Sequence, residues 1–384
     1  MTTARKKKNI LVVTGTRAEY GLLRPIMREI QKSKKLTLEV LVTGMHTLTK
    51  HGETMQEIRH DRMPIVSVVP VGLDDTMTDA LSKEIAGIGE YCAKNRPDLI
   101  VVLGDRDESF AGAIVGGHLG IPVAHIHGGD KTGLVVDEYI RHATTKFAHL
   151  HFAATKASAR RIKLLGEELW RVFVVGGPGL DELRSLKTLS KKDISMKYKL
   201  SAEKSWHVVL MHPVALDKTS LKNQIAPLLK EVSVLKGEKI ILYPNADTGS
   251  HIFIAEIEKY RDMPGVHIFQ HIPRVDLIAL LKNATLLIGN SSMGIIDASY
   301  LRIPTVNVGS RQAFRERGAN VIDAGYDTAS IVKAIRRVSS ASFKKKLVHA
   351  TSPYGDGKTA PRIARIIEKN INKAKLFHKT ITYV

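Results

Sequence analysis

The sequence is poor in cysteine and in aromatic residues, and it has no long apolar run. Cys92 is the single cysteine among 384 residues, and aromatic residues make up 5% of the chain. One cysteine can form neither an intrachain disulfide nor a thiolate metal cluster, which favours a cytoplasmic protein. Sparse aromatic residues offer few platforms on which nucleic-acid bases could stack. Apolar runs such as residues 99–103 are far shorter than the roughly 20 residues of a membrane span, and the run at 10–13 is too short for a signal peptide.

The sequence also has fewer acidic residues than basic residues. The chain has 58 Lys and Arg residues against 38 Asp and Glu residues, which gives a formal net charge of +20. This balance favours anionic partners such as nucleic acid, phosphorylated metabolites or anionic membranes. The basic residues are spread along the chain, with denser stretches at 5–8, 158–163, 186–204 and 344–346. Because neither zinc-finger spacing nor a heptad run accompanies them, we expect a small anionic substrate rather than nucleic acid or a membrane.

Short apolar runs alternate with segments of helical spacing over most of the chain. An apolar content of 43% and a charged content of 25% predict a packed globular protein. Near-continuous apolar runs between helices are typical of parallel strands covered on both faces, so the fold class is α/β. Strands are expected at 10–13, 38–42, 65–69, 99–103, 121–126, 150–153, 172–175, 206–211, 239–242, 266–269, 285–288 and 304–308. Helices are expected at 20–32, 76–95, 107–118 and 137–147.

The alternation weakens over one polar, lysine-rich stretch and then restarts, which predicts two α/β domains. We expect an N-terminal Rossmann-like domain over residues 1–180 and a linker region over 181–204. A C-terminal Rossmann-like nucleotide-binding domain is expected over 205–357. The segment 358–384 has the apolar stripe of a helix, and this helix and tail can cross back to the N-terminal domain.

The residues after each predicted strand are the first candidates for a site, because ligands bind beyond the carboxyl ends of strands in open parallel sheets. After the first strand, Thr14-Gly15-Thr16-Arg17 opens a helix. Helix N-termini attract anions, and the Arg17 guanidinium suits phosphate. The segment is neither G-x-G-x-x-G nor a P-loop, so NAD or ATP binding of those kinds is not expected. A tight turn without a ligand is the alternative.

Four charged residues follow the strand at 99–103, in the stretch Gly104-Asp105-Arg106-Asp107-Glu108. Charges at the carboxyl end of a strand suit a polar site, and we take Asp105 as a candidate catalytic residue. The alternative is structural, since Asp105 or Asp107 could cap the helix that follows.

The stretch 125–130 reads His125-Ile126-His127-Gly128-Gly129-Asp130 and ends another strand. If the strand continues, His125 and His127 lie on one face of the sheet. We take His127 and Asp130 as candidate site residues. A metal site built from the two histidines and nearby acids is the competing interpretation, although the H-E-x-x-H and deaminase patterns are missing.

Four more polar residues follow on the first turns of the next predicted helix. Asp137 and Arg141 share a face at i and i+4, as do Glu138 and His142. Asp137, Arg141 and His142 are candidate site residues, with Arg141 and His142 assigned to substrate binding. An ordinary helical salt bridge between Glu138 and His142 is the alternative.

The second domain repeats this arrangement. His212 follows its first strand and can carry a positive charge near a phosphate. Asn245 lies in a run of turn-forming residues, and Gln270 and His271 follow another strand.

After the strand at 285–288, Ser291 and Ser292 open a helix together with Gly294. Hydroxyl groups and backbone N–H groups at such a point suit a diphosphate. Asp297 lies about one and a half turns further along the expected helix, within reach of a ribose diol. A plain N-cap is the alternative for Ser291.

Six motifs in this order resemble the UDP-N-acetylglucosamine 2-epimerases, most closely the hydrolysing branch that feeds sialic-acid and related nonulosonic-acid synthesis. The resemblance covers about residues 8–375. The motifs are Gly15-Thr16-Arg17, Gly104-Asp105-Arg106, His125-Ile126-His127-Gly128-Gly129-Asp130, Asp137-Glu138-x-x-Arg141-His142, Met211-His212-Pro213 and Gly289-Asn290-Ser291-Ser292-x-Gly294.

The resemblance implies a GT-B-like fold, in which two Rossmann-like domains face each other across a cleft that holds the substrate. It implies a homodimer without metal or cofactor, and conversion of UDP-N-acetylglucosamine, or a close UDP-2-acetamido sugar, to UDP and the free 2-epimer. By similarity, the diphosphate would contact Arg17, His212, Ser291 and Ser292. The ribose would contact Asp297, and the uracil would lie near Gln270 and His271. Asp105 and Asp137 match catalytic carboxylates of the family, and His212 is a further catalytic candidate.

One departure from the family pattern bears on catalysis. Many relatives carry Glu where this chain has His127, and that Glu is a catalytic candidate. Either His127 acts as the base here or Asp130, three residues on, replaces the missing acid.

Three other functions fit the same motifs less well. A non-hydrolysing epimerase would return the UDP-linked epimer, and the His-Gly-Gly-Asp and Asp-Glu-x-x-Arg-His stretches argue against it. A GT-B glycosyltransferase would need an acceptor for turnover. A non-catalytic nucleotide or nucleic-acid binder would bind DNA or RNA in a salt-sensitive way without turning over a sugar.

Overall fold

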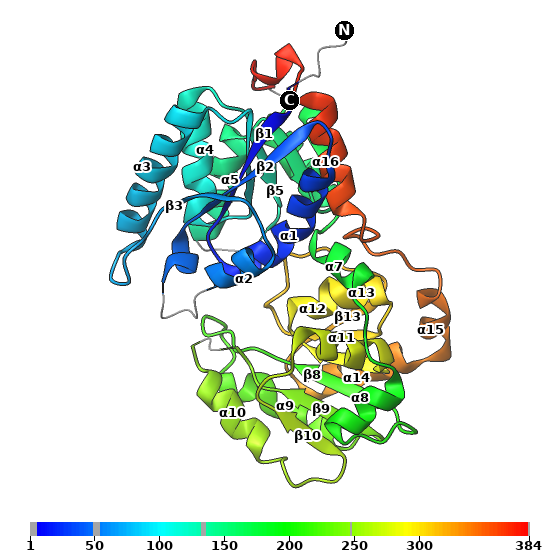
Figure 1. The fold of residues 1–384 in the computed structure, drawn as a ribbon. Coiled ribbons are helices and arrows are strands. Elements are labelled where there is room, and N and C mark those ends of the chain that lie inside the picture. The colour runs from blue at the N-terminus through cyan, green and yellow to red at the C-terminus, as the bar shows by residue number, and fades with distance from the viewer. Residues whose placement is uncertain (1–5, 49–53, 132–135, 246–247, 383–384) are drawn as a thin grey trace. The chain divides into compact units, whose positions relative to one another are not determined.

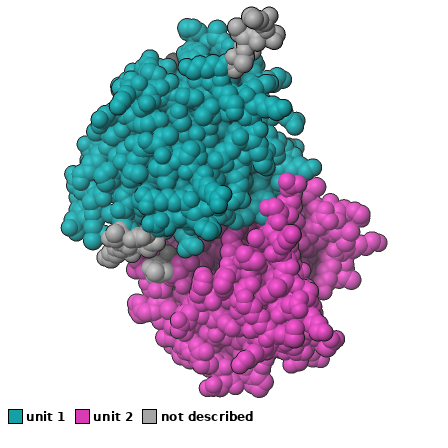
Figure 2. Space-filling view, viewed as in Figure 1, with its two compact units in different colours: residues 1–182, 355–384 teal, residues 183–354 magenta. Residues whose placement is uncertain are grey.

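The computed structural model describes residues 6–48, 54–131, 136–245 and 248–382. The chain forms two compact units, which are coloured separately in Figure 2. Unit 1 comprises Met1–Glu182 and Gly355–Val384, and unit 2 comprises Leu183–Tyr354.

Over the described residues, unit 1 contains a seven-stranded parallel sheet in the order β3-β2-β1-β4-β5-β6-β7. The register places Ile10 of β1 between Leu38 of β2 and Leu99 of β4. The strands are β1 (Lys8–Thr14), β2 (Leu36–Val42), β3 (Ile65–Val68), β4 (Leu99–Leu103), β5 (Val123–Ile126), β6 (Leu150–Ala153) and β7 (Val172–Val174).

Helices connect these strands and cover the sheet on both faces (Figure 1). They are α1 (Arg17–Lys32), α2 (Met55–His60), α3 (Met77–Asn95), α4 (Asp107–Leu119), α5 (Val136–Phe147), α6 (Lys156–Leu164), α7 (Gly179–Ser185) and α16 (Thr359–Asn370). Short 3₁₀ turns lie at η1 (Gly44–Thr47), η3 (Leu169–Arg171) and η4 (Ala374–Leu376).

The central strand β1 is buried on both sides, and its alternate side chains enter two separate cores. Ile10 and Val12 pack in the core that includes α1 and α16. Leu11 and Val13 pack in the core that includes α3 and α4. The period of two that a strand imposes therefore divides one apolar run between the two faces of the sheet.

The C-terminal segment belongs to unit 1, although it follows the whole of unit 2 in the sequence. Helix α16 packs beside α1, and its buried Ile363 and Ile367 join the core on that face (Figure 1). Beyond α16, the Arg171 guanidinium donates to the backbone carbonyls of Lys375, Leu376 and His378. The tail is thereby fixed against η3.

Unit 2 contains, within its described residues, a six-stranded parallel sheet in the order β10-β9-β8-β11-β12-β13. The strands are β8 (Trp206–Leu210), β9 (Glu238–Leu242), β10 (Val266–Phe269), β11 (Leu286–Gly289), β12 (Thr305–Val308) and β13 (Val321–Ala324). The helices are α8 (Lys191–Tyr198), α9 (Leu221–Ser233), α10 (Ser250–Glu258), α11 (Arg274–Asn283), α12 (Ser292–Ile295), α13 (Asp297–Leu301), α14 (Thr328–Ser339) and α15 (Ala341–Leu347).

In unit 2, as in unit 1, the central strand is buried on both faces of the sheet. Val209 of β8 packs with apolar residues of α9, α10 and α14. Its neighbours Val208 and Leu210 are also buried, and α11 lies on their side with Leu277–Leu281 almost completely buried.

These elements confirm the predicted α/β class, and each expected strand is present to within a few residues. Strand β13 was not predicted, because its four residues include Asp323 and give only a weak apolar signal. The segment 181–204, expected as a linker, contains the end of α7 and all of α8, and unit 2 begins at Leu183.

Candidate active site

The strand order of unit 1 reverses direction between β1 and β4, which is the place where open α/β sheets bind ligands. The loop after β1 and the loop after β4 both open there. Gly104, directly after β4, has a φ of 85°, a conformation that favours glycine. This turn leads the chain from the strand into the Asp105 segment.

Asp105 forms an ion pair with Arg141 of α5. The Arg141 side chain is 1% exposed, and it also donates to Glu138 Oε2 at 2.8 Å and to the Asp130 carbonyl at 3.0 Å. One buried guanidinium thus joins the loops after β4 and β5 to α5. The capping alternative for Asp105 and Asp107 is wrong, because the N-cap of α4 is Arg106, which makes no side-chain cap.

His127 and Asp130 form a second pair, with 2.8 Å between His127 Nδ1 and Asp130 Oδ2. The prediction that His125 and His127 share a face is wrong, because β5 ends at Ile126 and His127 has a left-handed φ of 64°. This backbone turn aims the His127 ring at Asp130. Asp130 Oδ1 in turn accepts a hydrogen bond from the Ser158 hydroxyl at 2.7 Å.

His125 has a structural position instead. Its ring is fully buried, with Nε2 2.7 Å from the Gly104 carbonyl and Nδ1 3.2 Å from the Thr145 hydroxyl. Burial lowers the pKa of His125 to about 3, so the ring is neutral at physiological pH. A neutral histidine that bonds a strand-end carbonyl stabilises the turn before Asp105.

Asp137 lies in the first turn of α5 and is half-buried. Burial and then the nearby charge of Asp105 raise its pKa. Asp107 likewise has a raised pKa, from burial and from the charge of Asp137. Carboxyl groups that raise one another's pKa are suited to exchanging protons near neutrality. The predicted helical contact between Glu138 and His142 is present at 3.3 Å.

The loop after β1 has the helix start that the sequence predicts. Thr16 caps α1 by accepting from the Glu19 N–H at 3.3 Å. The Arg17 side chain is 75% exposed, and its Nε lies 3.1 Å from Glu57 Oε2. It is therefore available to an anionic ligand.

The sequence did not predict three buried glutamates nearby, Glu19, Glu84 and Glu108, because nothing in the sequence marks a glutamate as buried.

In unit 2 the strand order reverses between β8 and β11, and His212 and Asn290 follow these strands. The Asn290 amide oxygen accepts from the His212 N–H at 2.7 Å, and its amide nitrogen donates to the His212 carbonyl, also at 2.7 Å. The Asn245 N–H donates to His212 Nδ1 at 3.1 Å. Because Nδ1 accepts, the proton of the neutral ring is on Nε2.

The serine segment differs from the single helix expected from the sequence. Ser291 is an N-cap, as its structural alternative predicted, and it accepts from the Met293 N–H at 3.3 Å. Helix α12 spans only Ser292–Ile295, and α13 starts anew at Asp297 after a break at Ile296. Asp297 is almost buried and pairs with Arg274 at 3.1 Å.

Of the three remaining candidate residues, two are exposed and one is buried. Gln270 and His271 are exposed in the loop between β10 and α11. Gly294 lies inside α12, where a Cβ would lie 2.9 Å from the Thr305 methyl group, so a larger residue would disturb β12.

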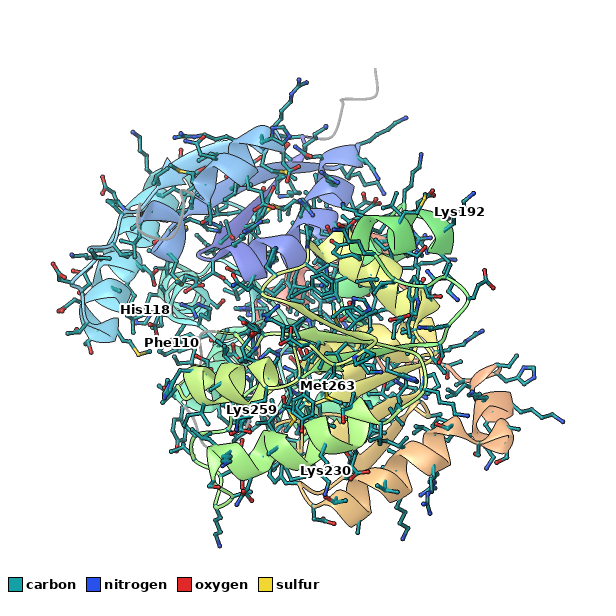
Figure 3. All side chains as sticks on the ribbon, turned by 90° about the horizontal axis from the view of Figure 1, so that it is seen from below. Phe110, His118, Lys192, Lys230, Lys259 and Met263 are labelled. Atoms are coloured by element: carbon teal, nitrogen blue, oxygen red, sulfur yellow. The ribbon has the colours of Figure 1, made fainter. Side chains whose placement is uncertain are left out.

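Exposed lysines of unit 2 lie on separate elements. Figure 3 labels Lys192 on α8, Lys230 on α9 and Lys259 just after α10.

Among the residues with described positions, no group of three or more His, Cys, Asp or Glu side chains is arranged to hold a metal ion. No helix in that part of the chain is long and apolar enough to cross a membrane.

Two Rossmann-like units, each with polar residues at the point where its strand order reverses, define an α/β enzyme with a GT-B-like fold. The chain belongs to the UDP-N-acetylglucosamine 2-epimerase family, whose model matches residues 28–368.

Curated relatives match almost the full length. The UDP-N,N'-diacetylbacillosamine 2-epimerase (hydrolyzing) of Legionella pneumophila is 37% identical over 98% of this chain and 100% of its own. The polysialic acid biosynthesis protein P7 of Escherichia coli is 35% identical over 96% and 95%. A UDP-N-acetylglucosamine 2-epimerase of Neisseria meningitidis is 32% identical over 96% and 98%.

Solved structures share the fold. The putative UDP-N-acetylglucosamine 2-epimerase of Listeria monocytogenes has a TM-score of 0.79 at 17% identity and covers 99% of this chain and 100% of its own. A Neisseria meningitidis UDP-GlcNAc 2-epimerase bound to UDP-GlcNAc has a TM-score of 0.77 at 19% identity, with 94% and 100% covered. The predicted family, fold and epimerase activity are confirmed by these comparisons.

Proposed function

We propose that this enzyme converts a UDP-linked 2-acetamido sugar to free UDP and the free 2-epimer of the sugar. The main structural support for this proposal is the group of polar side chains at the carboxyl edge of the unit 1 sheet, which consists of Asp105, Arg141, His127 and Asp130. The full-length relatives named as hydrolysing 2-epimerases of related UDP-sugars support the same reaction.

In the first step, a base takes the proton from carbon 2 while the bond between carbon 1 and the UDP oxygen breaks. UDP leaves with the bonding electrons, and a double bond forms between carbons 1 and 2. The carbon 2 proton is not acidic by itself, so departure of UDP must run ahead of proton transfer. Donors preorganised around the leaving diphosphate stabilise its developing charge. We propose the exposed Arg17, His212 Nε2–H and the N–H groups at Ser291 and Ser292 for this task.

In the second step, an acid protonates carbon 2 of the glycal on the opposite face and water adds at carbon 1. We propose that His127 takes part in one of the two proton transfers, with Asp130 as the group that orients it. A carboxylate that accepts from Nδ1–H makes Nε2 the basic nitrogen of the ring. Asp105 and Asp137 stabilise the positive charge that develops on the sugar ring, and one of them supplies the other proton transfer.

For the sugar, we propose N-acetylglucosamine or its 2,4-diacetamido relative. Curated relatives between 31% and 37% identical are named for either UDP-N-acetylglucosamine or UDP-N,N'-diacetylbacillosamine. These sugars share the 2-acetamido group at the reacting carbon and differ at carbons 4 and 6.

We further propose that the enzyme acts as a cytoplasmic homodimer without cofactor in sialic- or nonulosonic-acid synthesis. The single cysteine and the polysialic-acid relative support this setting.

The test is proton and phosphorus NMR of the enzyme with each UDP-sugar in D₂O. We expect free UDP together with the 2-epimer carrying deuterium at carbon 2, and the sugar that turns over with the higher kcat/KM identifies the substrate. A UDP-linked epimer without free UDP would instead assign the non-hydrolysing reaction. UDP binding without turnover of either sugar would contradict the epimerase proposal. Sedimentation velocity tests the homodimer.

A further inference from the structure

Three glutamates are buried beneath the loop that joins β1 to α1. Glu19 is 5% exposed, Glu84 is 1% exposed and Glu108 is 2% exposed. They come from α1, α3 and α4 respectively. Within the described part of the chain, Glu19 Oε1 and Glu84 Oε2 have no hydrogen-bond partner. Burying several carboxyl groups is costly unless some are neutral or paired, so their presence calls for an explanation.

Two of these glutamates hold Gly15 from different sides. Glu19 Oε2 accepts a hydrogen bond from the Gly15 N–H at 2.9 Å. The Glu108 carboxyl group lies so close to the Gly15 Cα that a Cβ there would be 2.4 Å from Glu108 Cδ. The Gly15 carbonyl accepts from the His46 N–H at 3.1 Å. The backbone of Gly15 is thus fixed at its N–H, its Cα and its carbonyl, two residues before Arg17.

The charges around Glu19 favour its neutral form. Glu108 faces it from α4 and Arg106 from the preceding loop, and Arg106 Nε lies 3.1 Å from Glu108 Oε1. Asp107 also faces Arg106, and Glu84 faces Glu108 from α3. Burial and then the charge of Glu108 raise the pKa of Glu19 well above its ordinary value.

The neighbouring groups differ from Glu19 in ways that an experiment can use. Burial raises the pKa of Glu84 to about 8. Burial lowers the pKa of His46 to about 4, so His46 carries no charge in the alkaline range. Glu84 therefore provides a matched control for Glu19: it is a buried glutamate of the same group without a bond to Gly15.

We propose that Glu19 and Glu108 are positioning residues for the diphosphate, which hold the β1–α1 loop through the bond from the Gly15 N–H to Glu19 and through the close approach of the Glu108 carboxyl group, paired with Arg106, to the Gly15 Cα. The inference rests on the proposed function, because Arg17 on this loop is a proposed diphosphate contact. Ionisation of Glu19 adds a buried negative charge under the loop and opposes a bound anion. UDP binding must then weaken when Glu19 loses its proton.

The experiment is calorimetric titration of the full chain with UDP from about pH 7 to about pH 8.5, between the ionisation of the terminal phosphate of UDP and that of its uracil N3–H. We expect the UDP Kd of the wild type to rise about tenfold with pH, as a charge appears near the diphosphate. Glu19→Gln keeps an oxygen for the Gly15 N–H but cannot ionise. It should bind within about twofold of the wild type at pH 7 and lose the alkaline weakening. Glu19→Met removes the acceptor and should bind about tenfold more weakly at every pH.

Glu84→Gln is the control and should keep the alkaline weakening. The inference is overturned if the wild-type Kd does not rise with pH, if Glu19→Gln keeps that weakening, if Glu84→Gln abolishes it, or if Glu19→Gln and Glu19→Met bind alike. Circular dichroism and thermal unfolding check that the variants fold, and the Gln variant remains decisive if the Met variant does not. A wild type that binds no UDP at any pH would overturn the proposed function and this inference together, whereas the outcomes above with UDP bound overturn the inference alone.

Discussion

His127 Nδ1 lies 2.8 Å from Asp130 Oδ2, at a residue whose backbone has the left-handed conformation. Non-glycine residues in this conformation are uncommon and cluster at functional sites. The pair lies at the position where the sequence departs from the family pattern and where many relatives carry Glu. A histidine oriented by a carboxylate can take and return a proton near neutral pH, as a glutamate with a raised pKa can.

We predict that His127→Gln and Asp130→Asn each lower kcat by about 100-fold, the usual scale for a general acid–base group, with a much smaller change in KM. The double variant should lose little more than either single variant, because the two side chains act as one unit. Steady-state kinetics measures both constants. His349→Gln, at an exposed histidine of unit 2, is the control and should leave kcat unchanged. Additive losses in the double variant would contradict a coupled pair.

We predict that Asp105→Asn lowers turnover far more than it weakens UDP binding. Asn keeps the size of the side chain and an oxygen toward Arg141, but it removes the negative charge that would face the positively charged sugar ring in the transition state. A loss of about 100-fold in kcat, with a UDP Kd within a few-fold of the wild type, is expected. Equal losses in kcat and in UDP affinity would assign Asp105 to binding rather than to catalysis.

We predict that Glu84 lowers the stability of the folded state as the pH rises from about 4.5 to about 8. Its pKa is raised to about 8 in the folded state, whereas the unfolded chain ionises near the ordinary value of 4.5. The folded state therefore holds a proton that the unfolded state releases, and unfolding becomes easier with pH across this window. The effect on the free energy of unfolding is on the order of 5 kcal/mol.

Urea unfolding at about pH 5 and about pH 8.5 measures this effect. Glu84→Gln cannot ionise, so its midpoint should fall less with pH than the wild-type midpoint does. Glu203→Gln, at an exposed glutamate, should follow the wild type. The prediction fails if Glu84→Gln and the wild type have the same pH dependence.

We predict that Lys379→Met destabilises unit 1 through α5. Lys379 Nζ donates to the Ala148 carbonyl at 2.7 Å and to the Lys146 carbonyl at 2.5 Å, at the C-terminal end of α5, and it pairs with the buried Glu167 at 2.7 Å. Burial raises the pKa of Glu167, but hydrogen bonds from His151, Lys146 and Lys379 outweigh burial and lower this pKa to about 2. Lys379→Met leaves Glu167 with Lys146 and His151 but takes the donor away from the two backbone carbonyls, which costs about 1 to 3 kcal/mol.

Thermal unfolding checks this prediction, with a fall of several degrees in the midpoint expected. Lys369→Met, at an exposed lysine of α16, should unfold like the wild type. A Lys379→Met variant as stable as the wild type would show that the tail does not support α5.

The sequence predicted the parts of the molecule that depend on local pattern. Apolar runs such as residues 99–103 and 206–210 are buried strands because a parallel sheet covered on both faces requires continuous apolar residues. The helix start at Thr16 and the N-cap at Ser291 also follow from local chemistry, since a hydroxyl group bonds an N–H only two or three residues away. The six ordered motifs identified the family because each motif is a short local stretch of the sequence.

Tertiary structure decided the contacts between residues that are distant in the sequence and the exact ends of the elements. Asp105 meets Arg141 of α5, and three glutamates from α1, α3 and α4 meet under one loop, because the strand order brings their elements together. The direction in which the His127 side chain points depends on where the strand ends, which is at Ile126. The break at Ile296 separates Asp297 from the helix that contains Ser292. Sequence by itself determines which residues can form strands, caps and polar loops, whereas packing determines which of their side chains are buried together and which of these stay charged.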